Sequence, residues 1–118
     1  MSHIVVIETK VHDAAALAAA CRRLGLAEPV HGSVRLFNAD ANGLSVKLPG
    51  WRYPIVVDPA SGSIKYDNYE GRWGDQEKLG LLLQMYAVEK AKIEARKKGH
   101  SVTEQARQDG SIVLQIVT

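Results

Sequence analysis

The stretch VRLFNADANGLSVKLPGWRYPIVVDPASGSIKY, residues 34–66, decides the fold. Short runs of β-branched and apolar residues alternate in it with the turn dipeptides Asn42-Gly43, Pro49-Gly50 and Ser61-Gly62. Turns at intervals of about ten residues are typical of an antiparallel meander. Pro54 lacks the N–H that a central strand donates, so we expect its strand at a sheet edge or bulged there. The pattern predicts four strands, over residues 34–37, 44–48, 51–57 and 64–66.

A strand and a helix precede this stretch. Residues 4–10 alternate and are rich in β-branched side chains, which predicts a strand. Asp13 is a favourable N-cap for a helix that runs through Leu24 and ends at Gly25. Apolar side chains recur on one face of this helix at spacings of three and four residues, which indicates one buried face.

A longer helix and two further strands follow the stretch. Asp75 is the expected N-cap of a helix that ends at Lys98. At about 24 residues this helix is roughly 36 Å long, which is longer than a small sheet needs. We therefore expect its basic C-terminal turns to project beyond the sheet or to meet a partner. Strands are predicted over residues 102–106 and 112–117, joined around Asp109-Gly110, a favoured tight-turn dipeptide.

The predicted order of elements is β-α-β-β-β-β-α-β-β. Runs of strands interrupted by two helices indicate an α+β fold, in which an antiparallel β-sheet carries both helices on one face. The chain has 118 residues, within the usual range of one domain, so we expect a single α+β domain over residues 1–118. A hydrophobic content of 46% and a charged content of 24% exclude a disordered chain.

Composition also limits where the protein works. Cys21 is the single cysteine, so no internal disulfide can form, which fits a reducing compartment. The apolar run near the N-terminus, Ile4 to Ile7, is too short for a signal peptide, and no run approaches the roughly 20 residues that span a bilayer. We expect a soluble, cytoplasmic protein with no membrane partner. The net charge of +2 is too small to indicate nucleic-acid binding by itself.

Short motifs spread over nearly the whole chain resemble one small family. They are Met1-Ser2-His3-Ile4, Glu8-Thr9-Lys10, Tyr53–Asp58, Gly62, Tyr66-Asp67-Asn68, Gly71, Trp73-Gly74, Gln84–Ala87, Gly99-His100, Glu104-Gln105 and Asp109–Ile112. The set is similar to the conserved hypothetical chloroplast reading frame thirty-five family, and most of all to its bacterial and viral branch. Plastid members differ in the middle segment and end in an aromatic residue, whereas this chain ends Val117-Thr118.

The resemblance implies a small single domain of unknown function, with no assigned reaction. Some relatives are thought to be encoded near an AAA-type ATPase and another very small protein. The resemblance therefore implies an accessory role beside such an ATPase, and it supplies no catalytic residue.

The residues themselves contain no pattern typical of an active site. His3, His12, His31 and His100 lie in four separate segments and lack the paired spacings of zinc ligands, so surface histidines are the expected interpretation. Cys21 lies on the apolar face of the first helix and is expected to be a buried filler.

Two other patterns do not support a chemical role. Gly71 to Gly74 precedes a helix but lacks the form of a phosphate loop, and the acidic Asp75 and Glu77 follow it. The aspartates Asp58, Asp67 and Asp109 lie at turns, where aspartate is expected structurally. We expect no cofactor, no metal and no enzymatic activity. An enzymatic hypothesis would require a deep pocket with converging titratable groups.

The leading functional hypothesis is a protein-binding or adaptor module. Three aromatic residues and one arginine lie in a short segment between a strand and a helix: Tyr66, Tyr69, Arg72 and Trp73. Aromatic and arginine side chains anchor interfaces because they bury a large area at a low cost in conformational entropy. The alternative interpretation is structural, with Trp73 and Tyr69 packed back over the helix start against Leu79.

The second hypothesis is weak nucleic-acid binding at the basic end of the long helix. Its candidate residues are Lys90, Lys92, Arg96, Lys97 and Lys98. Such a cluster can contact phosphates. Acidic residues at 89 and 94 alternate with the basic ones at spacings of three and four, which is typical of a solvated helix face. Self-association is a further hypothesis, because a strand beginning at residue 4 or ending at residue 117 could pair with a second copy.

Overall fold

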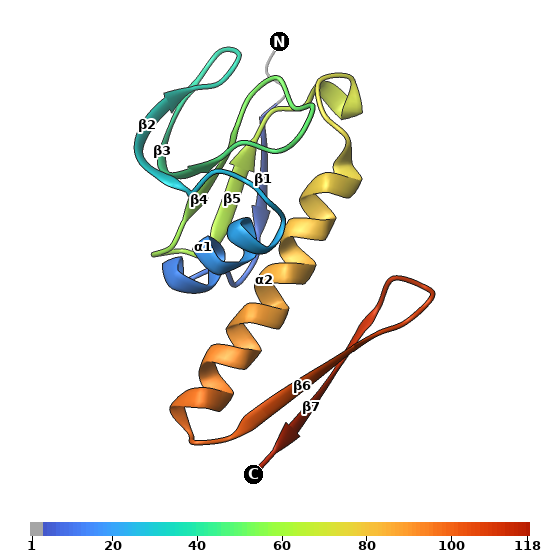
Figure 1. The fold of residues 1–118 in the computed structure, drawn as a ribbon. Coiled ribbons are helices and arrows are strands. Elements are labelled where there is room, and N and C mark those ends of the chain that lie inside the picture. Colours follow the sequence, from blue (N-terminus) through green and yellow to red (C-terminus); the bar gives the residue numbers. More distant parts are fainter. Residues whose placement is uncertain (1–3) are drawn as a thin grey trace.

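A five-stranded antiparallel sheet, two helices on one of its faces and a separate C-terminal hairpin make up the protein (Figure 1). The computed structural model describes residues 4–118. The elements are β1 Val5–Glu8, α1 Ala14–Arg23, β2 Val30–Arg35, β3 Asp40–Val46, β4 Ile55–Asp58, β5 Ser63–Tyr66, the short 3-10 helix η1 Tyr69–Gly71, α2 Gln76–Lys97, β6 Ser101–Ala106 and β7 Ile112–Val117. The predicted α+β class and the predicted order are confirmed.

The strand order of the sheet is β1-β5-β4-β3-β2, and every neighbouring pair is antiparallel. β4 is therefore the central strand, and the prediction that placed it at an edge or with a bulge was wrong. Pro54 lies one residue before β4 begins, so no ladder hydrogen bond is lost there.

The turn between β2 and β3 also differs from the prediction. It is closed by Leu36 N–H donating to the Ala39 carbonyl at 2.8 Å, and Asn42-Gly43 lies inside β3.

Both helices begin where the sequence predicted, and each ends one residue earlier than predicted, at Arg23 and at Lys97. The Asp13 carboxylate accepts hydrogen bonds from the N–H groups of Ala15 and Ala16, and Gly25 follows α1 with a φ of 72°. The Asp75 carboxylate accepts from Glu77 N–H at the start of α2. These caps satisfy N–H groups that have no partner inside the helix.

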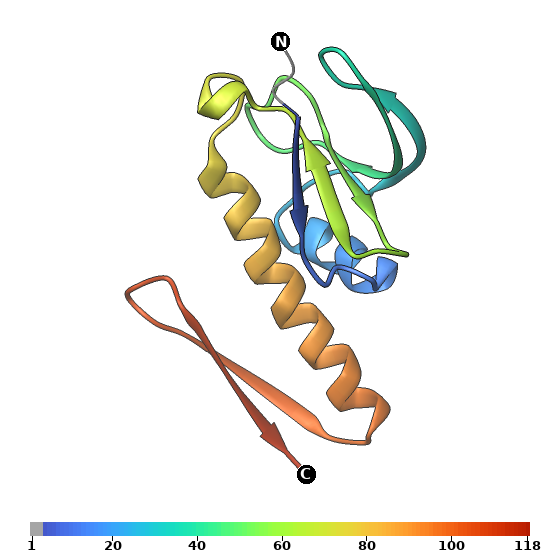
Figure 2. The ribbon, with the colours of Figure 1, turned by 180° about the vertical axis from the view of Figure 1, so that it is seen from behind.

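The main core lies between the helices and one face of the sheet. It contains the buried side chains Val11, Ala16, Leu17, Ala20, Cys21, Val46, Leu48, Ile55, Val57, Ile64, Tyr66, Leu79, Leu82, Met85 and Tyr86. A second, small cluster of Leu36, Ala41 and Val56 lies on the opposite face. In Figures 1 and 2 the β2–β3 hairpin lies at one edge of the sheet and is strongly curved. None of the helices within residues 4–118 combines the length and apolar composition needed to cross a membrane.

The last two strands form a sheet of their own and do not join the five-stranded sheet. The sequence predicted one sheet, whereas the structure has two. α2 has 22 residues, so at about 1.5 Å per residue it carries the chain roughly 33 Å. The hairpin then packs on the C-terminal part of α2 (Figures 1 and 2). The radius of gyration is 15.1 Å, against about 13.5 Å for a compact domain of this length, because the hairpin projects from the body.

Gly43 allows β3 to bend across the sheet. Its φ is 154°, and a Cβ atom added there would lie 2.3 Å from the carbonyl oxygen of Val57. Residues 44–46 pair with β4, whereas residues 40–43 pair only with β2. The outer half of the hairpin therefore leaves the sheet and places Leu36 and Ala41 over Val56.

We predict that Gly43→Ala destabilises the fold by about 1–3 kcal/mol, because backbone atoms would have to move to admit the methyl group. The matched control is Gly80→Ala on the exposed side of α2, where an added Cβ meets no atom within 4 Å. It should stabilise the protein by about 0.5–1 kcal/mol, since alanine favours a helix over glycine. Urea unfolding measures both changes, and equal effects at the two positions would contradict the account of β3.

Candidate interaction site

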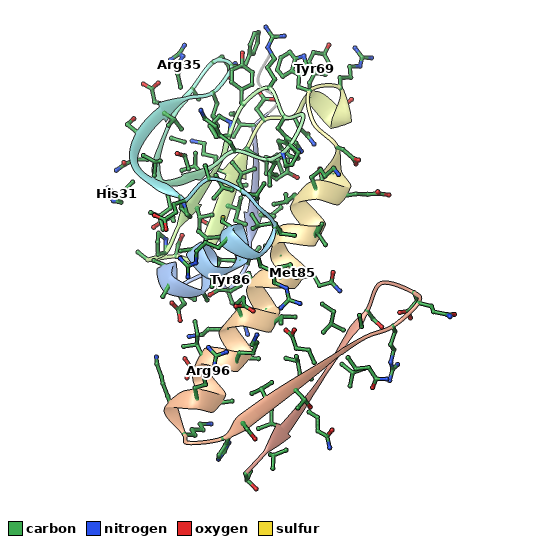
Figure 3. All side chains as sticks on the ribbon, viewed as in Figure 1. His31, Arg35, Tyr69, Met85, Tyr86 and Arg96 are labelled. Carbon is green, nitrogen blue, oxygen red and sulfur yellow. The ribbon has the colours of Figure 1, made fainter. Side chains whose placement is uncertain are left out.

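Three segments far apart in the sequence meet at the end of the molecule opposite the C-terminal end of α2. They are the β2–β3 turn with Phe37, the segment 51–54 before β4, and the loop 67–74 before α2. Figure 3 shows Tyr69 at one end of the molecule and Arg96 at the other. We call six residues of these segments the aromatic–arginine surface: the exposed Phe37, Arg52 and Arg72 and the half-buried Tyr53, Tyr69 and Trp73.

Trp73 is the centre of this surface. Its ring lies 4.8 Å from Tyr69, 5.1 Å from Phe37 and 5.7 Å from Tyr53, centroid to centroid. The rings are tilted or edge-to-face, which is the arrangement that their quadrupoles favour. The contacts tie all three segments together, so each ring is held by neighbours from other parts of the chain.

Two arginines lie over the faces of these rings. The Arg52 guanidinium carbon is 5.1 Å from the Trp73 centroid and 5.8 Å from that of Tyr53. Arg72 lies 4.8 Å from the Tyr69 centroid. Both arginine residues are exposed. Within residues 4–118 neither forms an ion pair, whereas Arg22, Arg23 and Arg35 all do.

Buried polar groups position the loop beneath the surface. Asn68 is 3% exposed, and its side-chain N–H groups donate to the Gly74 carbonyl and to Gln76. The backbone carbonyl of Asn68 accepts a hydrogen bond from the backbone N–H of Trp73 at 2.9 Å. The Arg52 N–H donates to the Trp73 carbonyl at 2.8 Å, which joins the loop to the segment before β4. Each buried polar group that these bonds satisfy would be costly to leave unpaired.

The loop also holds a strained backbone. Tyr69 and Glu70 have φ values of 48° and 54°, and Gly71 continues with 95°. Left-handed conformations cost non-glycine residues roughly 1–2 kcal/mol each. Such conformations persist where the surroundings hold them, and they cluster at binding and catalytic sites. In this conformation the Tyr69 ring lies against Trp73 and Arg72.

Tyr66 is not part of the exposed surface, although the sequence grouped it with Tyr69, Arg72 and Trp73. It is 5% exposed and packs edge-on against Trp51. Its hydroxyl accepts a hydrogen bond from Gln76 at 3.1 Å, so it supports the loop from the core. Tyr66 is the last residue of β5, and it lies two residues after Ile64 on the face of the strand that is buried in the main core.

The alternative interpretation placed Trp73 over the start of α2. A different tryptophan, Trp51, lies there. Trp51 packs against the main core, with its ring 5.6 Å from that of Tyr66, and its indole N–H donates to the Asp75 carbonyl at 3.0 Å. An added Cβ on Gly74 would lie 2.3 Å from the Trp51 ring, so glycine is needed there. Trp73 instead lies with Phe37 and Tyr53. Phe37, Arg52 and Tyr53 are absent from the predicted site because they lie outside the loop, in the strands predicted over residues 34–37 and 51–57.

The basic run on α2 is largely engaged in ion pairs. Lys90 contacts Asp13 at 3.1 Å and Glu94 at 2.8 Å. Lys92 contacts Glu89 and Glu104, and Lys97 contacts Glu94. The predicted pairs at spacings of three and four residues are therefore present. Among the described residues, Arg96 and Lys98 form no ion pair, and both are exposed.

Glu104 links the hairpin to both helices. Its carboxylate lies 2.6 Å from Arg23, which belongs to α1, and 3.7 Å from Lys92. The hydrogen bond from Arg23, the largest cause, holds the pKa of Glu104 below its ordinary value of 4.5. The Asp13 carboxyl has a lowered pKa as well, first because Ala16 N–H donates to it and then because of Lys90.

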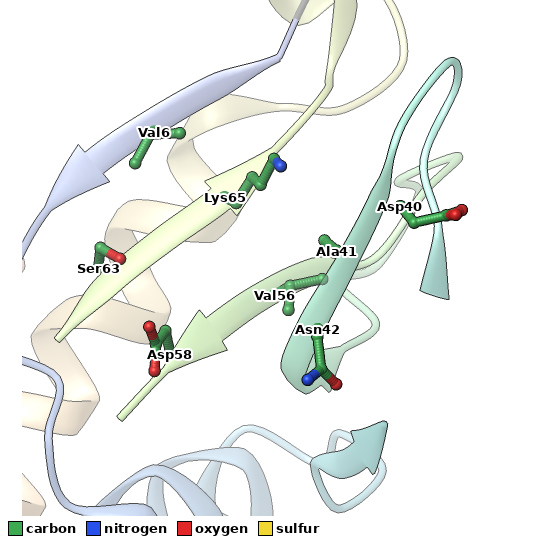
Figure 4. Close-up of a pocket in the computed structure, with 8 residues that line it drawn as sticks. All are labelled: Val6, Asp40, Ala41, Asn42, Val56, Asp58, Ser63 and Lys65. Carbon is green, nitrogen blue, oxygen red and sulfur yellow. The ribbon is translucent and has the colours of Figure 1, made fainter. Parts of the chain in front are cut away.

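A depression on the open sheet face contains two carboxylates, and both already have local partners. A depression of about 200 Å³ on the open sheet face is lined by Val6, Asp40, Ala41, Asn42, Val56, Asp58, Ser63 and Lys65 (Figure 4). Asp40 pairs with Arg35, and Asp58 accepts from Ala60 N–H and the Ser61 hydroxyl, so these carboxylates serve local structure. No group of three His, Cys, Asp or Glu side chains within residues 4–118 could hold a metal ion.

Cys21 and the described histidines lie in separate segments of the chain. Cys21 is buried, and burial raises the pKa of its thiol. His12 lies 2.8 Å from the Pro59 carbonyl through Nδ1, and His31 is exposed. His100 is half-buried, and His3 lies outside the described residues.

Comparison of the chain with protein-family models, with curated proteins and with solved structures found no match.

We predict that Glu104→Gln lowers the free energy of unfolding at pH 7 by about 0.5–1 kcal/mol, the usual size of a partly exposed ion pair. A carboxyl whose pKa is lowered by folding stabilises above its unfolded pKa, and the contribution disappears as the pH falls. The stability of the wild-type protein should therefore drop below pH 4.5 more steeply than that of the variant. Chemical unfolding between pH 7 and pH 3 tests this, and parallel curves would contradict it.

Proposed function

We propose that this protein is a non-enzymatic protein-binding or adaptor module that acts through the aromatic–arginine surface. The observation that carries the proposal is the pair of exposed arginines stacked on Trp73 and Tyr69 without an ion pair within residues 4–118. Interfaces are enriched in aromatic and arginine side chains, and such residues dominate their binding energy. Phe37, which is 46% exposed, adds apolar area beside them.

The arrangement favours a partner that presents carboxylates beside apolar side chains. A guanidinium stacked on an aromatic ring keeps its in-plane N–H donors available, and these match a carboxylate in bidentate geometry. Because Arg52 and Arg72 occupy ring faces of Trp73 and Tyr69, those faces are less accessible to stacked nucleic-acid bases. An acidic segment of a protein therefore fits this surface better than single-stranded nucleic acid.

The resemblance to the chloroplast reading frame thirty-five family suggests the setting. Relatives are thought to be encoded near an AAA-type ATPase, so a subunit of such an assembly is our proposed partner. A cytoplasmic location belongs to the same proposal. It is supported by the free thiol of Cys21, which is typical of a reducing compartment.

Nucleic-acid binding at the basic end of α2 is the second candidate. Arg96 and Lys98 support it, since both are exposed and form no ion pair among the described residues. Lys90, Lys92 and Lys97 contribute less, because nearby carboxylates already offset their charges. Binding of this kind would weaken steeply as salt is raised.

The test is a pull-down with the tagged full chain from lysate of the native host or its infected cells, read by mass spectrometry. We predict that the double variant Arg52→Gln with Arg72→Gln lowers recovery of a stoichiometric protein partner at least tenfold. Each lost hydrogen bond to a carboxylate is worth about 1.5–3 kcal/mol, and roughly 1.4 kcal/mol is a factor of ten. Glutamine leaves the rings in place, so the fold should be kept.

The matched control is Arg96→Gln with Lys98→Gln, which removes the same charge at the other end of the molecule. It should leave recovery of the protein partner unchanged at low and high salt. Loss of a nucleic-acid component in the control alone, with no protein affected by the arginine variant, would refute the adaptor proposal and favour the basic run. Trp73→Ala with Tyr69→Ala is a further variant; unchanged fold and unchanged partner recovery would exclude this site.

A further inference from the structure

The C-terminal hairpin has too few strands to be stable on its own. Among residues 4–118, β6 and β7 pair only with each other, and α2 is the element that they contact most. A two-stranded hairpin is marginally stable in water, and three or more strands with an apolar face are normally needed. The hairpin is attached to α2 by Gln84, which donates to the Gly110 carbonyl, and to α1 by the Arg23–Glu104 pair.

Contact with the helices leaves part of β7 uncovered. Glu104 pairs with residues of α1 and α2, so its face of the hairpin is turned toward the helices. Leu114 and Ile116 lie on that same face by register, yet Ile116 is 48% exposed. Val117 on the opposite face is 51% exposed. The C-terminal half of β7 lies on the outer side of the hairpin, away from α2, in both Figure 1 and Figure 2.

The composition of β7 sets it apart from the other edge strands. β1 contains Glu8, β2 contains Arg35 and β6 contains Glu104. Charges of this kind keep an exposed edge from pairing with another chain. β7, with the sequence IVLQIV, has five apolar residues and one glutamine and carries no charge or proline. An uncharged six-residue segment of high β-propensity on a free edge is a template for strand addition.

We propose that β7 pairs antiparallel with β7 of a second copy of this chain. A strand that pairs with itself across a two-fold axis is necessarily antiparallel, and the same side chains meet from both copies. The strand is suited to this because it brings no like charges together. The two hairpins would form one four-stranded sheet, β6-β7-β7-β6, which has the number of strands that a stable sheet needs.

A second copy of the chain is the partner that best fits the exposed edge of β7. Cross-strand partners in such a pair share a face, so Leu114 and Ile116 of one copy lie beside the same residues of the other. Each hairpin lacks the same neighbour and offers the same edge, so one contact completes both. The proposal is independent of the aromatic–arginine surface, which lies at the other end of the molecule.

The test is sedimentation of the full chain over a concentration series, with two charge variants at the exposed Gln115. We predict that the wild-type protein is a dimer and that Gln115→Lys and Gln115→Glu each raise its dissociation constant at least about tenfold, because like charges then meet across the two-fold axis. An equal mixture of the two variants should regain the dimer, because opposite charges then face each other. Neither variant removes apolar surface, so both should fold.

The matched control is Val30→Lys, which adds the same charge to the edge strand β2 at a residue that is 64% exposed. It should leave the dimer intact. A wild-type protein that stays monomeric up to about 100 μM overturns the proposal. So does a dimer that Val30→Lys disrupts and Gln115→Lys does not, or a mixture of the two Gln115 variants that fails to associate.

Discussion

The burial of α2 is the constraint on which the rest of the structure depends. Leu79 and Leu82 at its start are almost fully buried against the sheet, and Val88 and Ala95 further along are buried as well. The helix therefore has apolar residues on more than one side, and no single layer can cover them. The sheet and α1 cover the first part, and the hairpin packs on the second. The separation of the molecule into a body and a projecting hairpin follows from the length of this helix.

The aromatic–arginine surface depends on a second constraint, the bend of β3 at Gly43. Only a residue without a Cβ fits against the Val57 carbonyl, so the outer half of the β2–β3 hairpin crosses the open face and brings Phe37 to Trp73. The loop before α2 is held from the other side by Asn68 and Trp51. The surface is thus assembled on rigid elements, with the strained residues of the loop fixed by contacts on both sides.

Electrostatics divide the molecule into two ends of different character. At the α2 end, carboxylates such as Glu94 and Glu104 meet most of the lysines, so the charges serve to hold α1, α2 and the hairpin together. At the other end, Arg52 and Arg72 are held by ring faces, which leaves their hydrogen-bonding edges for a partner. Both ends carry positively charged side chains. They differ because carboxylates surround most of the lysines at one end, and aromatic rings hold the two arginines at the other.

The order of the elements and the starts of both helices follow from local sequence signals, because caps such as Asp13 and Asp75 and turns such as Asp109-Gly110 act on neighbouring residues. The sequence also located Trp73 and its loop. Only the tertiary structure decided that Tyr66 is buried, that Phe37 and Arg52 join Trp73, and that the last two strands stand apart. Those outcomes depend on contacts between segments tens of residues apart, and local propensity and periodicity carry no information about which distant side chains meet.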